Sequence, residues 1–201
     1  MKSVHDFIVM PVGDRYNNHL EVGDKKLILN STVEDHKFIN RKAVVISTPT
    51  SINTPIEEGD EVIIHHNVFR SYYNQQGKKV DSSKLLNEDH FFCQPDQVYL
   101  YKRLVKWCTV GKRCFVKPLE NKSDLRDKKT LNNVGVVRYN NSLLEAQGIT
   151  EGDCIAFKNN REFEFVIDNE LLYCLHTDDI LIKYEYKGDK KEYNPSWAKS
   201  S

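Results

Sequence analysis

The sequence has 201 residues, of which 39% are hydrophobic and 29% are charged, and its formal net charge at neutral pH is zero. This composition is typical of a globular protein with one large or two small domains and excludes a largely disordered chain. The balanced charge argues against a broad basic surface for nucleic acid or anionic lipid. We expect no signal peptide at Met1–Asp6 and no membrane-spanning segment, because no stretch approaches about 18 apolar residues.

Short apolar runs with period two, rich in β-branched and aromatic residues and separated by turn residues, predict β-strands. In chain order these runs are Phe7–Met10, Ala43–Ile46, Val62–Ile64, Val98–Tyr101 and Ile180–Ile182. Only Leu85–His90 and Ser142–Gln147 indicate helical turns. The pattern predicts an all-β protein built from small barrels or sandwiches. We expect the polar segment Gly188–Ser201 to be a loose tail, with Trp197 as the one residue able to dock.

Four landmarks occur twice in the same order, which is the signature of an internal repeat. A strand that ends in proline precedes a Val-Val strand, then a Gly-Asp turn that enters an apolar strand, and finally a closing strand that begins with aspartate. The first copy consists of Phe7–Pro11, Val44–Val45, Ile56–Ile64 and Asp96–Lys102, and the second of Cys114–Pro118, Val136–Val137, Ile149–Phe157 and Asp179–Tyr184. We therefore predict two copies of one β unit, with the boundary near Arg103–Trp107.

The first copy contains an insertion that the second copy lacks. The landmark proline and the Val-Val strand are 33 positions apart in the first copy and 18 in the second. Leu27, Ile28 and Leu29 form an isolated aliphatic triplet inside this longer segment. The triplet is either a short buried strand or an apolar surface for a partner. The second interpretation is favoured, because the shorter copy closes its strand pair without such a segment and long loops in compact domains are often functional.

This order of landmarks, with an aliphatic triplet in a long loop, resembles the GroES co-chaperonin family in its tandem, double-domain form. In that family the triplet of a mobile loop docks on the apical domain of a chaperonin. The resemblance therefore implies that Leu27, Ile28 and Leu29 bind a chaperonin. It also implies two tandem GroES-like, partly open β-barrels. The first barrel would comprise residues 1–104, with a mobile loop over about 13–41, and the second residues 105–187, without a long loop. Residues 188–201 would form a polar C-terminal tail.

The second copy departs from the family, because Asp124–Leu131 contains no aliphatic triplet, and we expect no chaperonin contact there. Ser47–Glu57 and Arg138–Thr150 are short where bacterial members form a roof hairpin. Some phage-encoded co-chaperonins are similar in this respect. Together with the stretch His65–Tyr73, this similarity leads us to expect a phage origin. The absence of a secretory signal and the free thiols lead us to expect a cytoplasmic location, which for a phage protein is the host cytoplasm.

The resemblance implies a co-chaperonin that caps a chaperonin folding chamber as a homo-oligomeric ring. The partner would hydrolyse ATP, so we expect this chain to be no enzyme and to need no cofactor; phosphate-binding and dinucleotide-binding motifs are absent from the sequence. We expect no metal site, because His65 and His66 would point to opposite faces of a strand. The five cysteines form no Cys-x-x-Cys motif and read as reduced thiols, with Cys114, Cys154 and Cys174 in the core.

Two other functions are compatible with the sequence. The first is a β-barrel structural or assembly protein, of viral origin in this view, that keeps the fold without binding a chaperonin. The second is a tandem barrel that binds single-stranded nucleic acid through Phe69–Tyr73, with Lys78 and Lys79 nearby. For that stretch we favour a hairpin that packs its aromatic side chains on the barrel and leaves its lysines in solvent, so no nucleic-acid partner is expected.

Overall fold

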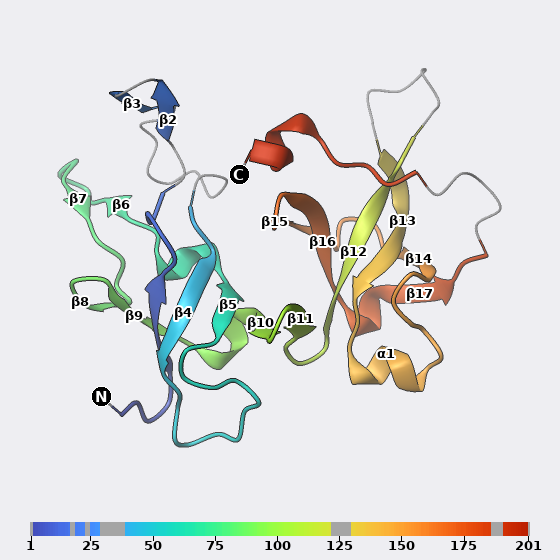
Figure 1. Cartoon of the computed structure of the whole chain (residues 1–201), viewed down its shortest axis with the longest axis horizontal. Coiled ribbons are helices and arrows are strands. Elements are labelled where there is room, and N and C mark those ends of the chain that lie inside the picture. Colours follow the sequence, from blue (N-terminus) through green and yellow to red (C-terminus); the bar gives the residue numbers. More distant parts are fainter. Residues whose placement is uncertain are drawn as a thin grey trace. The chain divides into compact units, whose positions relative to one another are not determined.

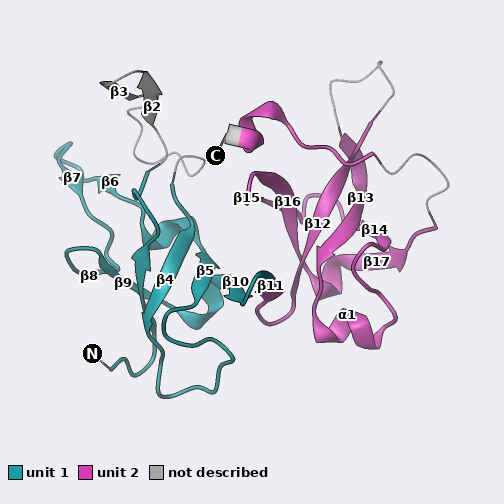
Figure 2. Cartoon of the chain, viewed as in Figure 1, with its two compact units in different colours: residues 1–106 teal, residues 107–201 magenta. Residues whose placement is uncertain are grey.

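The structure is a computed structural model that describes residues 2–16, 19–22, 25–28, 39–121, 130–185 and 191–200. The chain divides into two compact units, Met1–Lys106 and Trp107–Ser201 (Figures 1 and 2). The predicted all-β class is confirmed. Strands make up nearly all the regular structure, and α1 (Ser142–Ala146) is the one α-helix in the described part of the chain.

The first unit supplies β10, β5, β4, β1, β9 and β8 to a seven-stranded sheet with the order β11-β10-β5-β4-β1-β9-β8, and only the first residue of the edge strand β11 belongs to this unit. Two small sheets accompany it, β2 with β3 and β6 with β7. Short 3-10 turns are η2 (His66–Val68) and η3 (Pro95–Gln97). The strands are β1 (Phe7–Pro11), β2 (His19–Val22), β3 (Lys25–Ile28), β4 (Lys42–Ser47), β5 (Glu61–Ile64), β6 (Tyr72–Tyr73), β7 (Lys79–Val80), β8 (Leu85–Asn87), β9 (His90–Cys93), β10 (Val98–Arg103) and β11 (Lys106–Thr109). The division between the units falls within β11.

The second unit is built on a six-stranded sheet with the order β15-β16-β12-β13-β14-β17. Its strands are β12 (Arg113–Glu120), β13 (Thr130–Tyr139), β14 (Cys154–Phe157), β15 (Phe163–Ile167), β16 (Glu170–His176) and β17 (Ile180–Lys183). Helix α1 is capped by Asn141, whose side-chain oxygen accepts a hydrogen bond from the backbone N–H of Leu144 at 3.0 Å. Leu144 then packs into a core cluster with Val116, Ile155 and Leu175. Two 3-10 turns complete the unit, η4 (Thr177–Asp179) and η5 (Ser196–Ser200).

The two large sheets share one strand order. In the first unit β8-β9-β1-β4-β5-β10 are neighbours, and in the second β15-β16-β12-β13-β14-β17 follow one another in the same way. The predicted landmarks occupy matching strands, and even an irregularity is shared. The register of β1 against β4 shifts between Ile8 and Val9, and that of β12 against β13 shifts between Phe115 and Val116. The duplication read from the sequence is therefore a duplication of the fold.

The Gly-Asp turns are alike in their hydrogen bonds as well. Gly59 has φ +91° and its N–H donates to the carbonyl oxygen of Val45 at 2.7 Å; Gly152 has φ +89° and donates to Val137 at 2.8 Å. Each turn then closes on itself, because Oδ2 of the following aspartate accepts a backbone N–H three residues earlier, at 2.9 Å in the first unit and 2.7 Å in the second. Glycine is needed for the positive φ and aspartate for the acceptor, which explains why both were visible in the sequence.

Three expectations about the strands and the C-terminal tail are wrong. Leu85–Asn87 is the strand β8, paired with β9, and contains no helical turn. Pro118 lies inside β12 and pairs with Gly135, so it does not end that strand as Pro11 ends β1. The C-terminal tail is not loose over residues 191–200, where it forms a bridge to β12 and buries Ala198 completely. The tail was misjudged because its contacts are made by the backbone and by polar side chains, which hydropathy does not report.

All five cysteines are reduced thiols, as predicted, and four of them are buried. Burial raises the pKa of the Cys114 thiol to about 12 and also raises that of Cys93, because the thiolate would lose its solvation. We therefore expect Cys108, which is half-buried, to react alone with a thiol reagent such as DTNB under native conditions. All five should react in denaturant. Rapid reaction of more than one thiol in the native protein would contradict this packing.

Candidate functional site: the segment between β1 and β4

The candidate site is the long segment that leaves β1 after Pro11 and returns at Lys42, hereafter the excursion. Within it β2 and β3 pair with each other, with Leu20 opposite Leu27 and His19 opposite Ile28. In the part of the chain that the structure describes, these two strands form their own sheet and do not join the seven-stranded sheet. Leu27 and Ile28 thus lie on β3, whereas Leu29 lies outside the described residues.

The two ends of the excursion are joined by Asn40, which is only 8% exposed. Its side-chain amide donates hydrogen bonds to the carbonyl oxygens of Val12 at 2.8 Å and Asp14 at 3.0 Å. Its side-chain oxygen accepts from the N–H of Lys42 at 2.9 Å, and its backbone N–H donates to the carbonyl oxygen of Arg15 at 3.0 Å. One buried amide therefore satisfies backbone groups on both arms of the segment, and the arms are held together where they leave the sheet.

Arg15 anchors the outgoing arm to the neighbouring part of the same unit. Its guanidinium donates to the carbonyl oxygen of Phe69 at 2.7 Å and forms an ion pair with Asp81 at 2.9 Å, and it lies over the ring of Phe91 at 4.9 Å. The hydrogen bond from Arg15 holds the pKa of the Asp81 carboxyl below its usual value, although partial burial opposes this shift. Because the guanidinium satisfies several groups at once, it fixes the direction of the arm.

Tyr16 follows Arg15 and makes the next contacts of the outgoing arm with the first unit. It forms an antiparallel bridge with Ile39, and its hydroxyl accepts a hydrogen bond from the N–H of Ser71 at 2.7 Å. Asn40, Arg15 and Tyr16 together form what we call the root clamp. Sequence reasoning missed all three residues. An arginine and an asparagine that flank a loop carry no distinctive signal when their partners lie up to 66 positions away.

The β6–β7 hairpin is the predicted aromatic and basic stretch. Phe69, just before it, is completely buried and meets Phe91 edge-on at 4.9 Å, as the packing interpretation expected. Tyr72 and Tyr73 differ from that expectation, because they are 40% and 49% exposed. Lys79 of the same hairpin lies 5.8 Å from the centre of the Tyr16 ring. The hairpin thus supports the root clamp on one side and presents aromatic surface on another.

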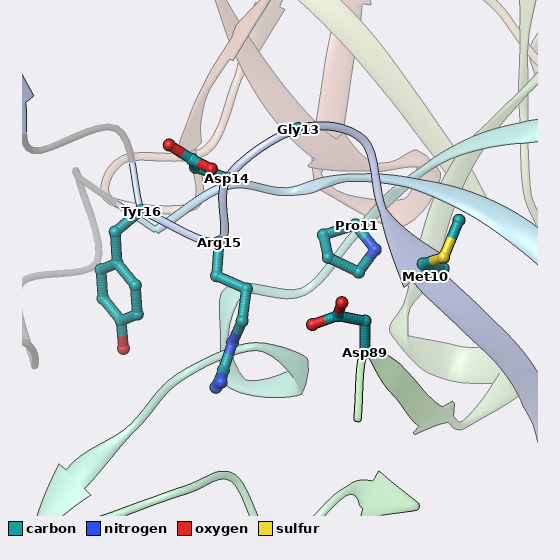
Figure 3. A pocket seen from close by; sticks show the side chains of 7 residues that line it. All are labelled: Met10, Pro11, Gly13, Asp14, Arg15, Tyr16 and Asp89. Carbon is teal, nitrogen blue, oxygen red and sulfur yellow. The ribbon is translucent and has the colours of Figure 1, made fainter. Parts of the chain in front are cut away.

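An open recess of about 470 Å³ lies beside the outgoing arm (Figure 3). Its walls come from the end of β1, from the first residues of the excursion and from the turn between β8 and β9. The lining residues are Met10, Pro11, Gly13, Asp14, Arg15, Tyr16 and Asp89. Its polar groups are the carboxylates of Asp14 and Asp89, backbone atoms, and the side chains of Arg15 and Tyr16, which belong to the root clamp.

The two adjacent histidines are arranged differently from the prediction. His66 lies in the 3-10 turn η2, and its ring stacks on that of His65 with 4.3 Å between centroids. The rings therefore face each other and do not lie on opposite faces of a strand. Among the described residues, no three His, Cys, Asp or Glu side chains gather in a way that could hold a metal ion.

No protein-family model matches the sequence, and no curated protein matches it either. Across the described ranges, no helix is both long and apolar enough to span a membrane. The interpretation of the excursion therefore depends on the residues and geometry given above.

Proposed function

We propose that this protein is a co-chaperonin that caps a chaperonin folding chamber and binds it through Leu27, Ile28 and Leu29. On this proposal the two units are tandem GroES-like, partly open barrels, and only the first contacts the chaperonin. The observation that carries the proposal is the placement of β2 and β3 in a separate small sheet, on a segment whose two ends are clamped to the first unit. Such a segment can present apolar residues without unfolding its own domain.

The energetics suit a lid that must come off again. Burying three aliphatic side chains contributes about 1.5–3 kcal/mol each. Ordering the loop residues costs about 1–2 kcal/mol apiece, which offsets most of that gain. A single loop therefore binds weakly, and the root clamp reduces the cost by fixing where the two arms begin. Several loops on one homo-oligomeric ring would add avidity by a factor of about 10² to 10⁴.

The division of labour follows from the same proposal. The chaperonin would bind and hydrolyse ATP, and this chain would act as a non-enzymatic partner without a cofactor. The second unit would then have another role in the assembly, since its equivalent connection lacks the triplet.

The test is a triple substitution, Leu27→Ser, Ile28→Ser and Leu29→Ser, in the full chain. We expect the variant to fold normally and to lose ATP-dependent co-elution with a chaperonin ring such as GroEL, and with it the ability to support refolding. The matched control is Leu104→Ser with Val105→Ser, because these aliphatic side chains are 91% and 90% exposed in the β10–β11 turn. The control should co-elute like the unmodified protein.

Two outcomes would contradict the proposal. Unfolding of the triple variant would place the triplet in the core of its own subunit. Failure of the unmodified protein to bind any chaperonin ring would instead favour a structural or assembly protein that keeps the fold.

A further inference from the structure

In the second unit, residues 191–200, hereafter the C-terminal strap, complete an edge of the sheet. The edge arises because β12 and β16 separate after the pair Val116–Tyr173. The strap enters the resulting gap. The N–H of Tyr193 donates to the carbonyl oxygen of Pro118 at 2.8 Å, and the N–H of Glu120 donates to the carbonyl oxygen of Lys191 at 2.8 Å.

Side chains on the strap fix it from both sides. On the β12 side, the Glu192 carboxylate meets the ammonium of Lys117 at 2.7 Å. On the β16 side, the side-chain oxygen of Asn194 accepts from the N–H of Leu171 at 3.0 Å, and its amide donates to the carbonyl oxygen of Asn169 at 2.9 Å. The second unit therefore contains a peptide-binding edge that is filled by its own chain.

The first unit has the corresponding edge, and none of the residues that the structure describes pairs along it as the strap does in the second unit. Its strands β1 and β9 separate after the pair Val9–Phe91, which matches Val116–Tyr173 in the shared register. Pro11 then corresponds to Pro118, and Gly13 to Glu120. The N–H of Val12 donates to the carbonyl oxygen of Lys42 at the start of β4. The carbonyl oxygen of Pro11 belongs to the same peptide group and points the opposite way, toward the edge that faces away from β4.

The recess lies at this edge. Figure 3 shows Asp89 approaching Pro11 from the β8–β9 turn, with Gly13 at the top of the outgoing arm. Gly13 has φ +79°, and its N–H makes no hydrogen bond with any residue in the described ranges. The recess in the first unit thus offers the two backbone groups that the second unit uses to hold its strap.

The charge of the two edges differs, and this difference indicates the ligand. Lys117, which receives Glu192 in the second unit, corresponds to Met10, which is 36% exposed. Asp14 and Asp89 also line the recess. In a peptide bound to the first unit, an acidic residue at the position of Glu192 would meet Met10 and would have no ammonium group to pair with. A lysine at that position could pack its aliphatic stem on Met10 and reach a carboxylate with its ammonium.

We propose that the recess of the first unit binds an extended basic peptide segment of a partner protein, by the backbone pairing that the second unit makes with its own strap. The segment would accept from the N–H of Gly13, donate to the carbonyl oxygen of Pro11 and place a lysine or arginine near Asp89. This is β-strand addition at an exposed edge, with main-chain hydrogen bonds for affinity and one charged contact for specificity. The inference is independent of the proposed chaperonin binding, which uses the triplet.

The test uses the full chain and two fluorescein-labelled peptides. The control peptide, Lys-Glu-Tyr-Asn-Pro, copies strap residues 191–195, and the probe peptide is its Glu192→Lys derivative, Lys-Lys-Tyr-Asn-Pro. Fluorescence anisotropy should show saturable binding of the probe peptide, about tenfold tighter than that of the control peptide. In protein labelled with ¹⁵N-glycine, which gives nine backbone signals, the Gly13 signal should move on addition of the probe peptide.

Variants make the assignment specific. Asp89→Asn should weaken probe binding about tenfold, while Glu58→Gln, at an exposed acidic residue outside the recess, should not. Met10→Lys recreates the Lys117 arrangement and should reverse the preference toward the control peptide. Equal binding of both peptides, or an unmoved Gly13 signal, would overturn the proposal. So would dissociation of an oligomer by Asp89→Asn in sedimentation, since a second copy of the chain would then be the occupant.

Discussion

Replacing Asn40 with alanine should lower the free energy of unfolding of the first unit by about 2–4 kcal/mol, because three hydrogen bonds to backbone groups are lost at a buried position. The carbonyl oxygens of Val12 and Asp14 would be left without the amide, and the N–H of Lys42 without its acceptor. Asn40→Asp should be no better. It keeps the acceptor but places a carboxylate against the two carbonyl oxygens.

The chain contains its own reporters for this measurement. Cys93 is the single cysteine of the first unit and is buried, while both tryptophans, Trp107 and Trp197, belong to the second unit. Labelling of Cys93 in urea should therefore speed up in Asn40→Ala, whereas the tryptophan fluorescence transition should not move.

The control for this experiment is Asn74→Ala. The side chain of Asn74 also accepts two backbone N–H groups, from Gln76 and Lys78, but in an exposed turn where water can replace it. We expect its effect to be below that of Asn40→Ala. Equal effects of the two alanine variants would show that Asn40 does not hold the excursion. The clamp also predicts that Asn40→Ala weakens chaperonin binding even where the first unit remains folded, because the arms would begin from less defined positions.

The duplication could be predicted from the sequence because each landmark follows from a local requirement. Gly59 and Gly152 supply a positive φ, and Asp60 and Asp153 accept the hydrogen bond that closes each turn. Requirements of this kind depend on a few consecutive residues, so they remain visible in a sequence read alone. Their repetition in one order gave the matching strand order of the two units.

The root clamp and the strap could not be predicted, because their contacts connect segments that are distant in the sequence, through backbone atoms and polar side chains. Arg15 reaches Phe69 and Asp81, and Tyr193 reaches Pro118, and none of these pairs has a local pattern. The false helical turn at Leu85–His90 has a related cause. Leu85 pairs with Phe91 across a tight turn in which Glu88 has φ +38°, and this pairing depends on the partner strand β9 and not on the spacing of apolar residues within Leu85–His90.

The aliphatic triplet is the part of the site for which the sequence remains the main source. Leu27 and Ile28 belong to a strand pair outside the large sheets, which agrees with a segment that the fold does not require. Whether the triplet binds a chaperonin stays a prediction. What the fold adds is the clamp, since an apolar segment anchored at both ends loses less entropy on binding than a free chain of the same length.

Replacing Lys117 with alanine should release the strap from the second unit. Lys117 is 9% exposed and its ammonium meets Glu170 at 3.0 Å and Glu192 at 2.7 Å. Removing it leaves two carboxylates without their common partner. Because Glu192 is half-exposed and partly screened by water, we expect a loss of about 1–3 kcal/mol, less than for a fully buried pair. The most direct measurement is hydrogen exchange at the Tyr193 amide, which should speed up as its bond to Pro118 opens more often.

The pH dependence of this loss has a definite sign. Burial opposes charging of Lys117, but hydrogen bonds to Glu192 and Glu170 outweigh it and raise the pKa of Lys117 above its usual value. The stabilisation is therefore fully present below the unfolded pKa of about 10.4 and is lost as the pH rises through the higher folded value. The difference in stability between the unmodified protein and Lys117→Ala should shrink only above that pH.

Two further variants separate charge from packing at this position. Lys117→Met carries the side chain found at the corresponding Met10, and it should keep the packing of the stem while still freeing the strap. Lys158→Ala removes an exposed ammonium that meets Asp179 at 3.2 Å in the same unit, and it should change stability by less than about 1 kcal/mol. Unchanged exchange at Tyr193 in both Lys117 variants would mean that backbone pairing alone holds the strap. A segment bound to the first unit would then need no charged residue, and the basic and acidic peptides would bind its recess equally.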